Sequence, residues 1–154
     1  MGEKTVLEFR RVSSDCETML TDFFAVIESR QISRYFHPHP FTPEKAKSLC
    51  LYDGNDLYYV ASDGTRILGY GMLRGWDEGY EIPSLGIVLH PEMRGIGLGK
   101  LFMHFLHAAA KLRGTKRIRL KVYPENEVAV NLYKNLGYRY EGKQEGQLIG
   151  YLDL

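Results

Sequence analysis

Two periods of hydrophobic residues run through the chain and separate its expected strands from its expected helices. Between Arg117 and Val122, basic and aliphatic residues alternate, which predicts a strand with one buried face. After Gly97, apolar residues recur at helical spacing and polar residues occupy the opposite face. The apolar stripe consists of Leu98, Leu101, Phe102, Phe105, Ala109 and Leu112, and the polar stripe of Lys100, His104, His107 and Lys111. We therefore expect an amphipathic helix that ends at Gly114 and holds both histidines in solvent.

The same patterns, combined with cap and turn signals, predict alternating elements over all 154 residues. Expected strands cover residues 5–12, 57–61, 66–73, 80–89 and 117–122, and a final hairpin covers 138–154. Expected helices cover residues 15–30, 42–51, 98–113 and 126–137. This order is typical of an α/β or α+β fold with helices on both faces of one sheet. The length suits a single domain that spans residues 1–154.

Composition narrows the class of protein further than the net charge of +1 suggests. Residues 93–122 hold eight basic and no acidic side chains, which leaves 12 basic and 19 acidic residues in the rest of the chain. The near-neutral total argues against a general nucleic-acid coat protein, and the acidic remainder favours a cationic acceptor. The two cysteines are too few for a disulfide scaffold, and no segment reaches the ~20 apolar residues of a membrane span. We expect a cytoplasmic monomer or homodimer with no nucleic-acid or membrane partner.

The most informative segment lies between the strand that ends near Leu89 and the helix that follows it. From Arg94 to Lys100 the sequence is RGIGLGK, with glycine at three alternate positions. Glycine permits a tight turn and leaves backbone N–H groups uncovered at a helix N-terminus, where an anion such as a diphosphate is favoured. A Walker A motif does not match, because Leu101 follows the lysine. A dinucleotide fingerprint does not match either, because Lys100 stands where its third glycine belongs.

Two motifs, in order and on suitable elements, resemble those of one family. Arg94-x-x-Gly97-x-Gly99, between a strand and a helix, resembles the acyl-CoA signature of the GNAT superfamily of N-acetyltransferases. Its second motif is matched downstream by Asn126-x-x-Ala129-x-x-Leu132-Tyr133-x-x-x-Gly137-Tyr138. The resemblance implies a mixed, mainly antiparallel sheet of six to seven strands with about four helices on its two faces. It also implies transfer of an acetyl group from acetyl-CoA to a primary amine, by direct attack in a ternary complex and without a metal.

The resemblance further implies a role for each matching residue. The CoA pyrophosphate would lie on the backbone of Arg94, Gly95, Ile96, Gly97, Leu98, Gly99 and Lys100. The pantetheine arm would run beside Ile87, Val88 and Leu89, and a backbone N–H near Val88 would stabilise the negative charge that develops on the thioester oxygen. Tyr133 would protonate the departing thiolate, and Asn126 would contact pantetheine. Helix-core packing and helix capping are the structural alternatives for these two side chains.

The general base is the residue that the resemblance specifies least. An amine with a pKa near ~10 must lose a proton before it attacks. Many family members carry a glutamate where this chain has Pro83. Glu81 lies two residues earlier, on the same face of a regular strand, and it is the first candidate, acting directly or through water. Asp77 and Glu78, in the preceding loop, stay open as alternatives.

The expected acceptor site combines aromatic residues from two parts of the chain. Tyr35, Phe36 and His37 belong to a proline-rich segment between the first two helices, which in this family often form a wall of the acceptor site. Trp76, with Arg74 and Tyr80, is expected to line the pocket from the adjoining strand and loop, and ordinary packing at the surface edge is the structural alternative. The acceptor is a small-molecule amine, an amino sugar or a peptide N-terminus. No Cys or carboxylate cluster accompanies the His-x-His pair that begins at residue 37, so we expect no metal there.

Two other functions fit parts of the sequence. A catalytically inactive CoA-binding or interaction domain would keep the glycine-rich turn and lack a base, in keeping with Pro83. A nucleic-acid-binding module would use the basic stretch together with the tyrosines for phosphate contacts and stacking. Its basic residues, however, are spread over a turn, a helix and a strand.

Overall fold

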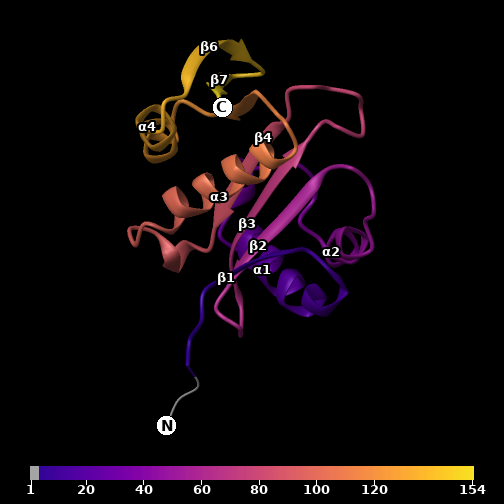
Figure 1. Cartoon of the computed structure of the whole chain (residues 1–154). Helices are drawn as coiled ribbons and strands as arrows, with labels where there is room; N and C mark the ends of the chain where they lie inside the picture. The colour runs from indigo at the N-terminus through magenta and orange to yellow at the C-terminus, as the bar shows by residue number, and fades with distance from the viewer. Residues whose placement is uncertain (1–3) are drawn as a thin grey trace.

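The computed structural model describes residues 4–154 and contains one seven-stranded sheet (Figure 1). The strands are β1 (Glu8–Arg11), β2 (Leu57–Ser62), β3 (Ile67–Arg74), β4 (Ser84–Leu89), β5 (Arg117–Val122), β6 (Arg139–Gln144) and β7 (Gln147–Asp153). They lie in the order β1-β2-β3-β4-β5-β7-β6, and every neighbouring pair is antiparallel except β4 and β5. The mixed, mainly antiparallel sheet that the resemblance implies is confirmed.

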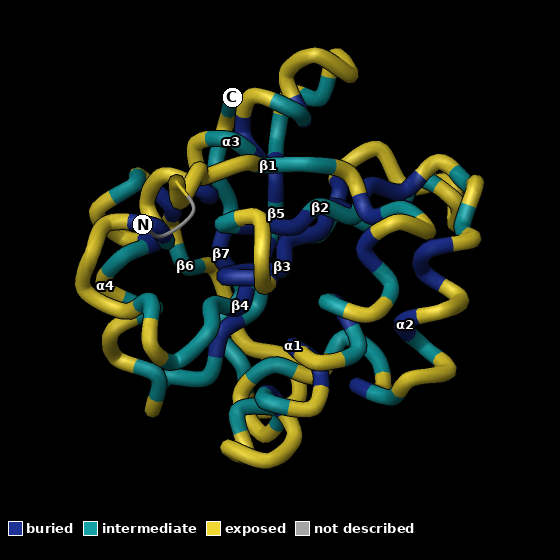
Figure 2. The backbone as a smooth tube through the Cα atoms, turned by 90° about the horizontal axis from the view of Figure 1, so that it is seen from below, coloured by how far each residue is buried: buried dark blue, intermediate teal, exposed yellow. Residues whose placement is uncertain are grey.

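The α-helices cover both faces of the sheet: α1 (Glu17–Ser29), α2 (Pro43–Cys50), α3 (Leu98–Leu112) and α4 (Glu127–Asn135). Helices α1 and α2 pack on Tyr70, Met72 and Val88 in one core. Helices α3 and α4 pack in a second core on the opposite face, and in Figure 2 the buried strands lie between the two layers. Within residues 4–154 no helix is both long and apolar enough to cross a bilayer.

Helix α2 begins where the sequence signals predict. The Thr42 side chain accepts a hydrogen bond from the Lys45 N–H (3.1 Å), and Pro43 occupies the first turn, where its missing N–H is not needed. Helix α1 begins later than predicted, because Ser14–Cys16 form a separate 3₁₀ turn and Asp15 is therefore not the cap. The first strand is also shorter than the predicted span of 5–12.

The strand predicted over residues 80–89 begins only at Ser84. The residues before it form a loop in which Gly75 and Gly79 adopt positive φ angles of 126° and 86°. The Tyr80 N–H closes this loop by donating to the Gly75 carbonyl (2.9 Å). Glu81 therefore lies on the loop, and its expected position on a regular strand face is wrong.

Helix α3 buries a different face from the one that its apolar stripe predicts. Leu101 and Leu112 are 48% and 91% exposed, whereas His107 is 8% exposed. The imidazole Nε2 of His107 and the hydroxyl of Tyr138 share a hydrogen bond of 2.8 Å, which satisfies the buried polar group. The buried residues of α3 are Leu98, Phe102, Met103, Leu106, His107 and Ala110.

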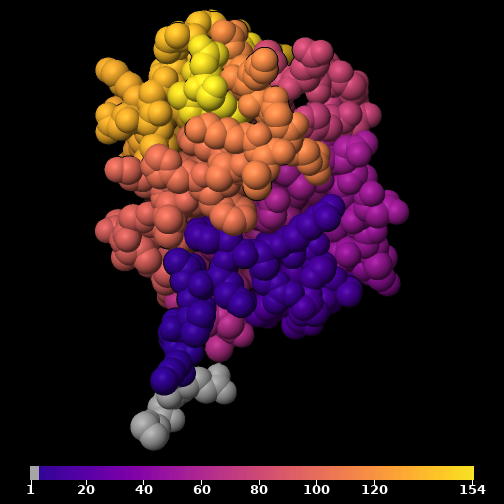
Figure 3. Space-filling view, viewed as in Figure 1, coloured from indigo at the N-terminus to yellow at the C-terminus, as the bar shows by residue number. Residues whose placement is uncertain are grey.

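Glycines in β3 allow α3 to approach the sheet closely. A Cβ added at Gly71 would lie 2.8 Å from the Phe102 ring, and one at Gly69 would lie 3.3 Å from it. Phe9 of β1 packs edge-on against the same ring and stacks on Phe105. In Figure 3 the amino-terminal segment, in indigo, accordingly lies against the surface formed by the middle of the chain. This packing fixes α3, and with it the turn that precedes α3, relative to β4.

Two histidines, His107 buried and His39 half-buried, make stability depend on pH. Burial lowers the pKa of both His39 and His107 from 6.5 to about 4. As the pH falls from 6.5 towards 4, the unfolded chain takes up protons on these rings that the folded chain does not, so the free energy of unfolding decreases. We expect His107→Gln to make this decrease shallower in urea denaturation followed at a series of pH values. The exposed His104→Gln is the control, and equal slopes in the two variants would contradict the assignment.

Candidate active site

Strands β4 and β5 pair only at their first shared position. The parallel register joins Ser84 to Arg119 and stops there, and the Arg119 N–H donates to the Pro83 carbonyl at 3.0 Å. The other edge of β4 stays paired with β3 along its whole length, as far as Leu89. A gap therefore opens along one edge of β4 after its first residue.

The gap faces the backbone groups of alternate residues in β4. The N–H of His90, the next residue after the strand, donates to the Leu68 carbonyl (2.8 Å), and no register shift interrupts the ladder between β3 and β4. In an antiparallel pair the N–H and C=O groups of successive residues point to opposite edges. Those of Val88 therefore face β3, and those of Ile87 and Leu89 face the gap. The backbone N–H expected near Val88 to point into the gap therefore belongs to Ile87 or Leu89.

The glycine-rich turn joins the end of β4 to α3. Gly95 and Gly97 have φ angles of 81° and 85°, a region that side chains with a Cβ avoid. Gly99, in contrast, lies inside α3. A Cβ added at Gly95 or Gly97 would meet no atom within 4 Å. The two glycines are therefore required by backbone conformation, and the space beside them is open.

This turn leaves free donors at the start of α3. The first intrahelical bond runs from the Leu101 N–H to the Gly97 carbonyl (3.1 Å). The N–H groups of the first three helical residues thus have no partner within the helix. Arg94 and Lys100 are exposed on either side of them. The free donors, the helix dipole and the two cations suit the pyrophosphate of CoA.

Helix α4 flanks the same end of the gap. A Cβ added at Gly99 would touch Leu89 (3.4 Å) and Leu132 (3.6 Å), so α4 lies close to the junction of β4 and α3. Tyr133, the next residue of α4, is 8% exposed, and burial raises the pKa of its hydroxyl. Asn126 is the N-cap residue of α4, without a capping hydrogen bond from its side chain.

A pocket of about 260 Å³ lies on the face of the sheet that α1 and α2 cover, beside the start of β4. Three of the predicted acceptor residues, Tyr35, Phe36 and His37, line it. The His37 Nε2 and the Tyr123 hydroxyl, just after β5, share a hydrogen bond of 2.7 Å. The other residues that line this pocket are Pro38, Met72, Arg74, Ser84, Leu85, Gly86, Lys121, Glu145 and Gln147.

A second pocket of about 710 Å³ continues from the first. The two share Arg74, Ser84 and Lys121, so they form one groove over the β4–β5 contact. Its other lining residues are Gly75, Glu78, Gly79, Tyr80, Glu81, Ile82, Arg119 and Tyr151. Two of the three candidate bases thus lie on the wall of this groove.

The remaining predicted residues lie elsewhere. Asp77 accepts hydrogen bonds from the Tyr52 hydroxyl and from the Asn55 N–H (2.8 Å), and these bonds hold the pKa of its carboxyl below the usual range. The Trp76 ring lies 4.8 Å from the Arg113 guanidinium and packs in the core of α3 and α4. Neither residue lines the groove.

The two histidines of the proline-rich segment point to different environments. His39 donates from Nδ1 to the Pro40 carbonyl and accepts at Nε2 from the Tyr70 hydroxyl, both at 2.8 Å. The His39 ring is therefore neutral and half-buried, whereas His37 lies at the groove. Among residues 4–154, no three His, Cys, Asp or Glu side chains gather in a way that suits a metal ion.

Arg74 and Tyr80 line the groove as expected from the sequence, but sequence reasoning missed the two cations that β5 adds to its floor. The alternation in β5 predicts that Arg119 and Lys121 share a face, and the structure confirms this. The sequence alone contains no signal that this face meets the proline-rich segment and the loop before β4. Ser84 and Gly86, which complete the floor, carried no signal either.

The comparison with known families now decides the identity. The model of the acetyltransferase (GNAT) family matches residues 21–138 of the chain. The chain belongs to the GNAT acetyltransferase family. The match includes both motifs and the whole of the β4–β5 region.

Solved GNAT structures share the fold over nearly the full chain. A ribosomal-protein-S5-alanine acetyltransferase from Vibrio fischeri matches with a TM-score of 0.80 and 17% identity, covering 99% of this chain and 94% of that one. A PaiA N-acetyltransferase from Thermoplasma acidophilum, in complex with coenzyme A, gives 0.77 and 18%, covering 97% and 99%. A spermidine N-acetyltransferase from Vibrio cholerae, in complex with CoA and spermine, gives 0.74 and 21%, covering 96% and 95%.

Alanine substitutions at Gly97 and Gly99 should have different effects on stability. Gly97→Ala forces a Cβ into a left-handed conformation and should lower the free energy of unfolding by about 1 kcal/mol. Gly99→Ala makes only ordinary contacts inside a helix and should be neutral or stabilising. Urea denaturation of both variants measures the difference, and equal stabilities would contradict the conformations described for the turn.

Proposed function

We propose that this GNAT protein transfers the acetyl group of acetyl-CoA to a primary amine, which attacks the thioester directly in a ternary complex. The observation that carries the proposal is the gap beside β4. It connects the start of α3, whose free N–H groups suit an anion, with the groove at its other end. A donor and an acceptor could therefore meet at the gap, each entering from its own side. The neighbours in complex with CoA, and with CoA and spermine, support a CoA thioester as donor and an amine as acceptor.

The acetyl donor, when bound, supplies a thioester carbonyl that an amine can attack. The start of α3, with Arg94 and Lys100, would hold its pyrophosphate. The Ile87 and Leu89 backbone groups would pair with its pantetheine arm. An N–H of one of these residues would also face the carbonyl oxygen, where a fixed donor stabilises developing negative charge without reorganisation. Asn126 would contact the same arm from the start of α4.

Tyr133 is the proposed acid that protonates the departing thiolate. Burial raises the pKa of its hydroxyl, so the group carries its proton at neutral pH and has one to donate. No hydrogen bond joins this hydroxyl to another residue in the described part of the chain, so its proton is not committed to a protein acceptor. The preceding residue, Leu132, lies beside Gly99, so α4 would bring Tyr133 to the same end of the gap.

Glu81 is the proposed base, acting directly or through water, with Glu78 as the alternative. Both carboxylates line the groove, and both are exposed, so solvent can carry the proton away. A CoA-binding domain without turnover is the second candidate function. It is favoured by Pro83, which stands where many family members have a glutamate and which has no side chain that could act as a base. The Pro83 carbonyl accepts a hydrogen bond from the Arg119 N–H.

The proposed function is tested by release of free thiol from acetyl-CoA in the presence of an amine panel. Tyr133→Phe should bind CoA with unchanged affinity in calorimetry but lose about 10²-fold or more in kcat, because the acid is missing. Tyr59→Phe, in β2 and away from the gap, is the matched control. Wild-type turnover in Tyr133→Phe would remove Tyr133 as the acid. CoA binding without turnover on any amine would instead favour the inactive domain.

The base is tested by pH–rate profiles of two glutamate variants. Glu81→Gln should lower kcat/KM by about 10²-fold at pH 7 and by less as the pH approaches the ~10 of the free amine, which then needs no base. Glu78→Gln is the matched control from the same loop. If Glu78→Gln alone shows this profile, Glu78 is the base, and unchanged profiles in both variants would exclude a glutamate.

A further inference from the structure

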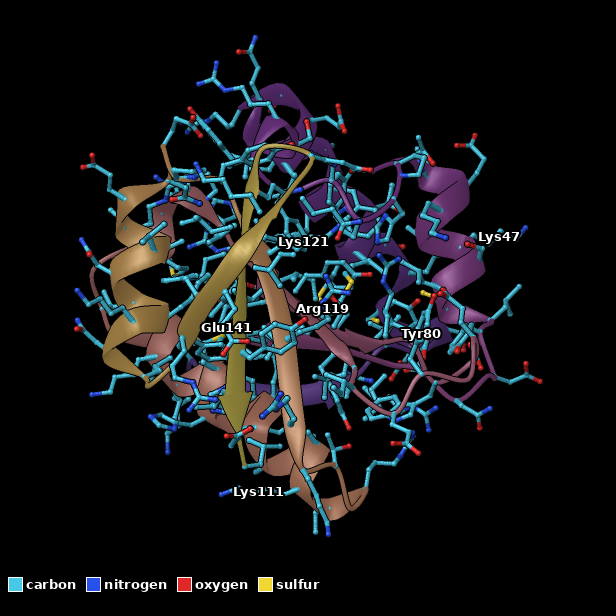
Figure 4. All side chains as sticks on the ribbon, turned by 90° about the horizontal axis from the view of Figure 1, so that it is seen from above. Lys47, Tyr80, Lys111, Arg119, Lys121 and Glu141 are labelled. Carbon is cyan, nitrogen blue, oxygen red and sulfur yellow. The ribbon has the colours of Figure 1, made fainter. Side chains whose placement is uncertain are left out.

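Three cationic side chains meet on the floor of the groove. Arg74 of β3 pairs with Ser84 of β4, and Ser84 pairs with Arg119 of β5. Lys121 follows two residues later on the same face. In Figure 4, Arg119 and Lys121 lie near the middle of the view with Tyr80 to one side of them. The three cations thus come from β3 and β5, the two strands on either side of β4, and they gather at Ser84, where β4 begins.

These cations have no acidic partner among residues 4–154. The Arg74 Nη1 donates to the Pro38 carbonyl (3.2 Å), and the Arg119 Nη2 donates to the Gln144 side-chain oxygen (3.4 Å), so both acceptors are neutral. The Arg119 Nε is buried and has no hydrogen-bond partner. Arg117, two residues earlier on the same strand, does bind a carboxylate, that of Asp153 at 2.7 Å. None of the ion pairs formed by the described residues includes one of these three cations.

The acidic side chains of the groove are more exposed than its cationic side chains. Glu78, Glu81 and Glu145 are all exposed, whereas Arg74, Arg119 and Lys121 are half-buried. An acceptor that fills the groove therefore meets positive charge on the floor and negative charge at the rim. The groove and the glycine-rich turn also lie at opposite ends of β4, since Ser84 begins the strand and the turn follows its other end. The cations on the floor are thus separate from those beside the turn.

We propose that the acceptor carries an anionic group, a carboxylate or a phosphate, in addition to its amine. Arg119 and Arg74 would hold that group, with Lys121 beside them, because a guanidinium presents paired donors to two anionic oxygens. The amine would then lie towards Gly86, where the first pocket borders the gap. The position of the amine rests on the proposed acetyl transfer, whereas the anion site does not. The acidic remainder of the sequence favours a purely cationic acceptor, and the local arrangement reverses that expectation.

The test is calorimetry on the CoA-loaded protein with matched pairs of small amines. The carboxylate pair is γ-aminobutyrate and butylamine, and the phosphate pairs are phosphoethanolamine and ethanolamine, and glucosamine 6-phosphate and glucosamine. Spermidine serves as a polycation. In at least one pair the anionic member should bind about tenfold or more tightly than the neutral one. The pair that shows the preference tells carboxylate from phosphate.

Charge-removing variants assign the preference to the groove. Arg119→Gln and Lys121→Gln should each reduce it about tenfold, while CoA affinity, measured separately, reports that the fold is intact. Lys47→Gln and Lys111→Gln are matched controls, because both residues are exposed and lie at the edges of the view in Figure 4. They should leave the preference unchanged.

Two results would overturn the inference. The first is that the anionic member binds no better than its neutral partner or spermidine in every pair, and the second is that the preference survives in both groove variants. Acetyl transfer is followed on the same panel in a separate assay. Binding of an anionic amine without transfer would count against the proposed function and leave the anion site standing, so the two failures are distinguishable.

Discussion

The contact between β4 and β5 ends after one residue pair, and the rest of the site depends on that interruption. Backbone donors and acceptors inside a sheet are normally paired, and unpaired ones demand another partner. Here the Ser84–Arg119 pair closes the sheet at one end, and the strands then stop sharing bonds. Ile87 and Leu89 are left with main-chain groups that a ligand in extended conformation can satisfy. The same pair also brings Arg119 and Arg74 to either side of Ser84 and thereby forms the floor of the groove.

The two faces of the sheet contribute different parts of the site: one holds α3 and its free N–H groups in place, and the other carries the groove. On one face, Phe102 lies over glycines of β3 and fixes α3, so the free N–H groups at its start point at a constant place relative to β4. On the other face, α1 and α2 build a core with β2, β3 and β4, and within the described residues that core includes no residue of β5, β6 or β7. The uncovered part of this face is where the proline-rich segment, the loop before β4 and the last hairpin border the groove.

Local sequence signals predicted the elements and the turn well, because glycine spacing, helix caps and strand alternation act over a few residues. The features that they missed depend on distant partners. His107 falls on the polar stripe of α3. Its burial is made favourable by a hydrogen bond with Tyr138, which comes shortly after α4 in the sequence. Glu81 left the expected strand because Gly75 and Gly79 close a loop. Trp76 turned to Arg113 of α3 instead of the pocket. The charges of Arg119 and Lys121 were visible as a pattern, but their meeting with Arg74 follows from the strand order, which the pattern does not encode.

The central claim is that the gap beside β4 receives the acetyl donor through alternate backbone groups. Amide hydrogen exchange of the protein with and without CoA, resolved by residue, tests it most directly. Val88 already bonds to β3, so its exchange should change little when CoA is added. The amides of Ile87 and Leu89, and those at the start of α3, should become protected. Protection of Val88 alone, or no protection of β4 while CoA is bound, would contradict this account.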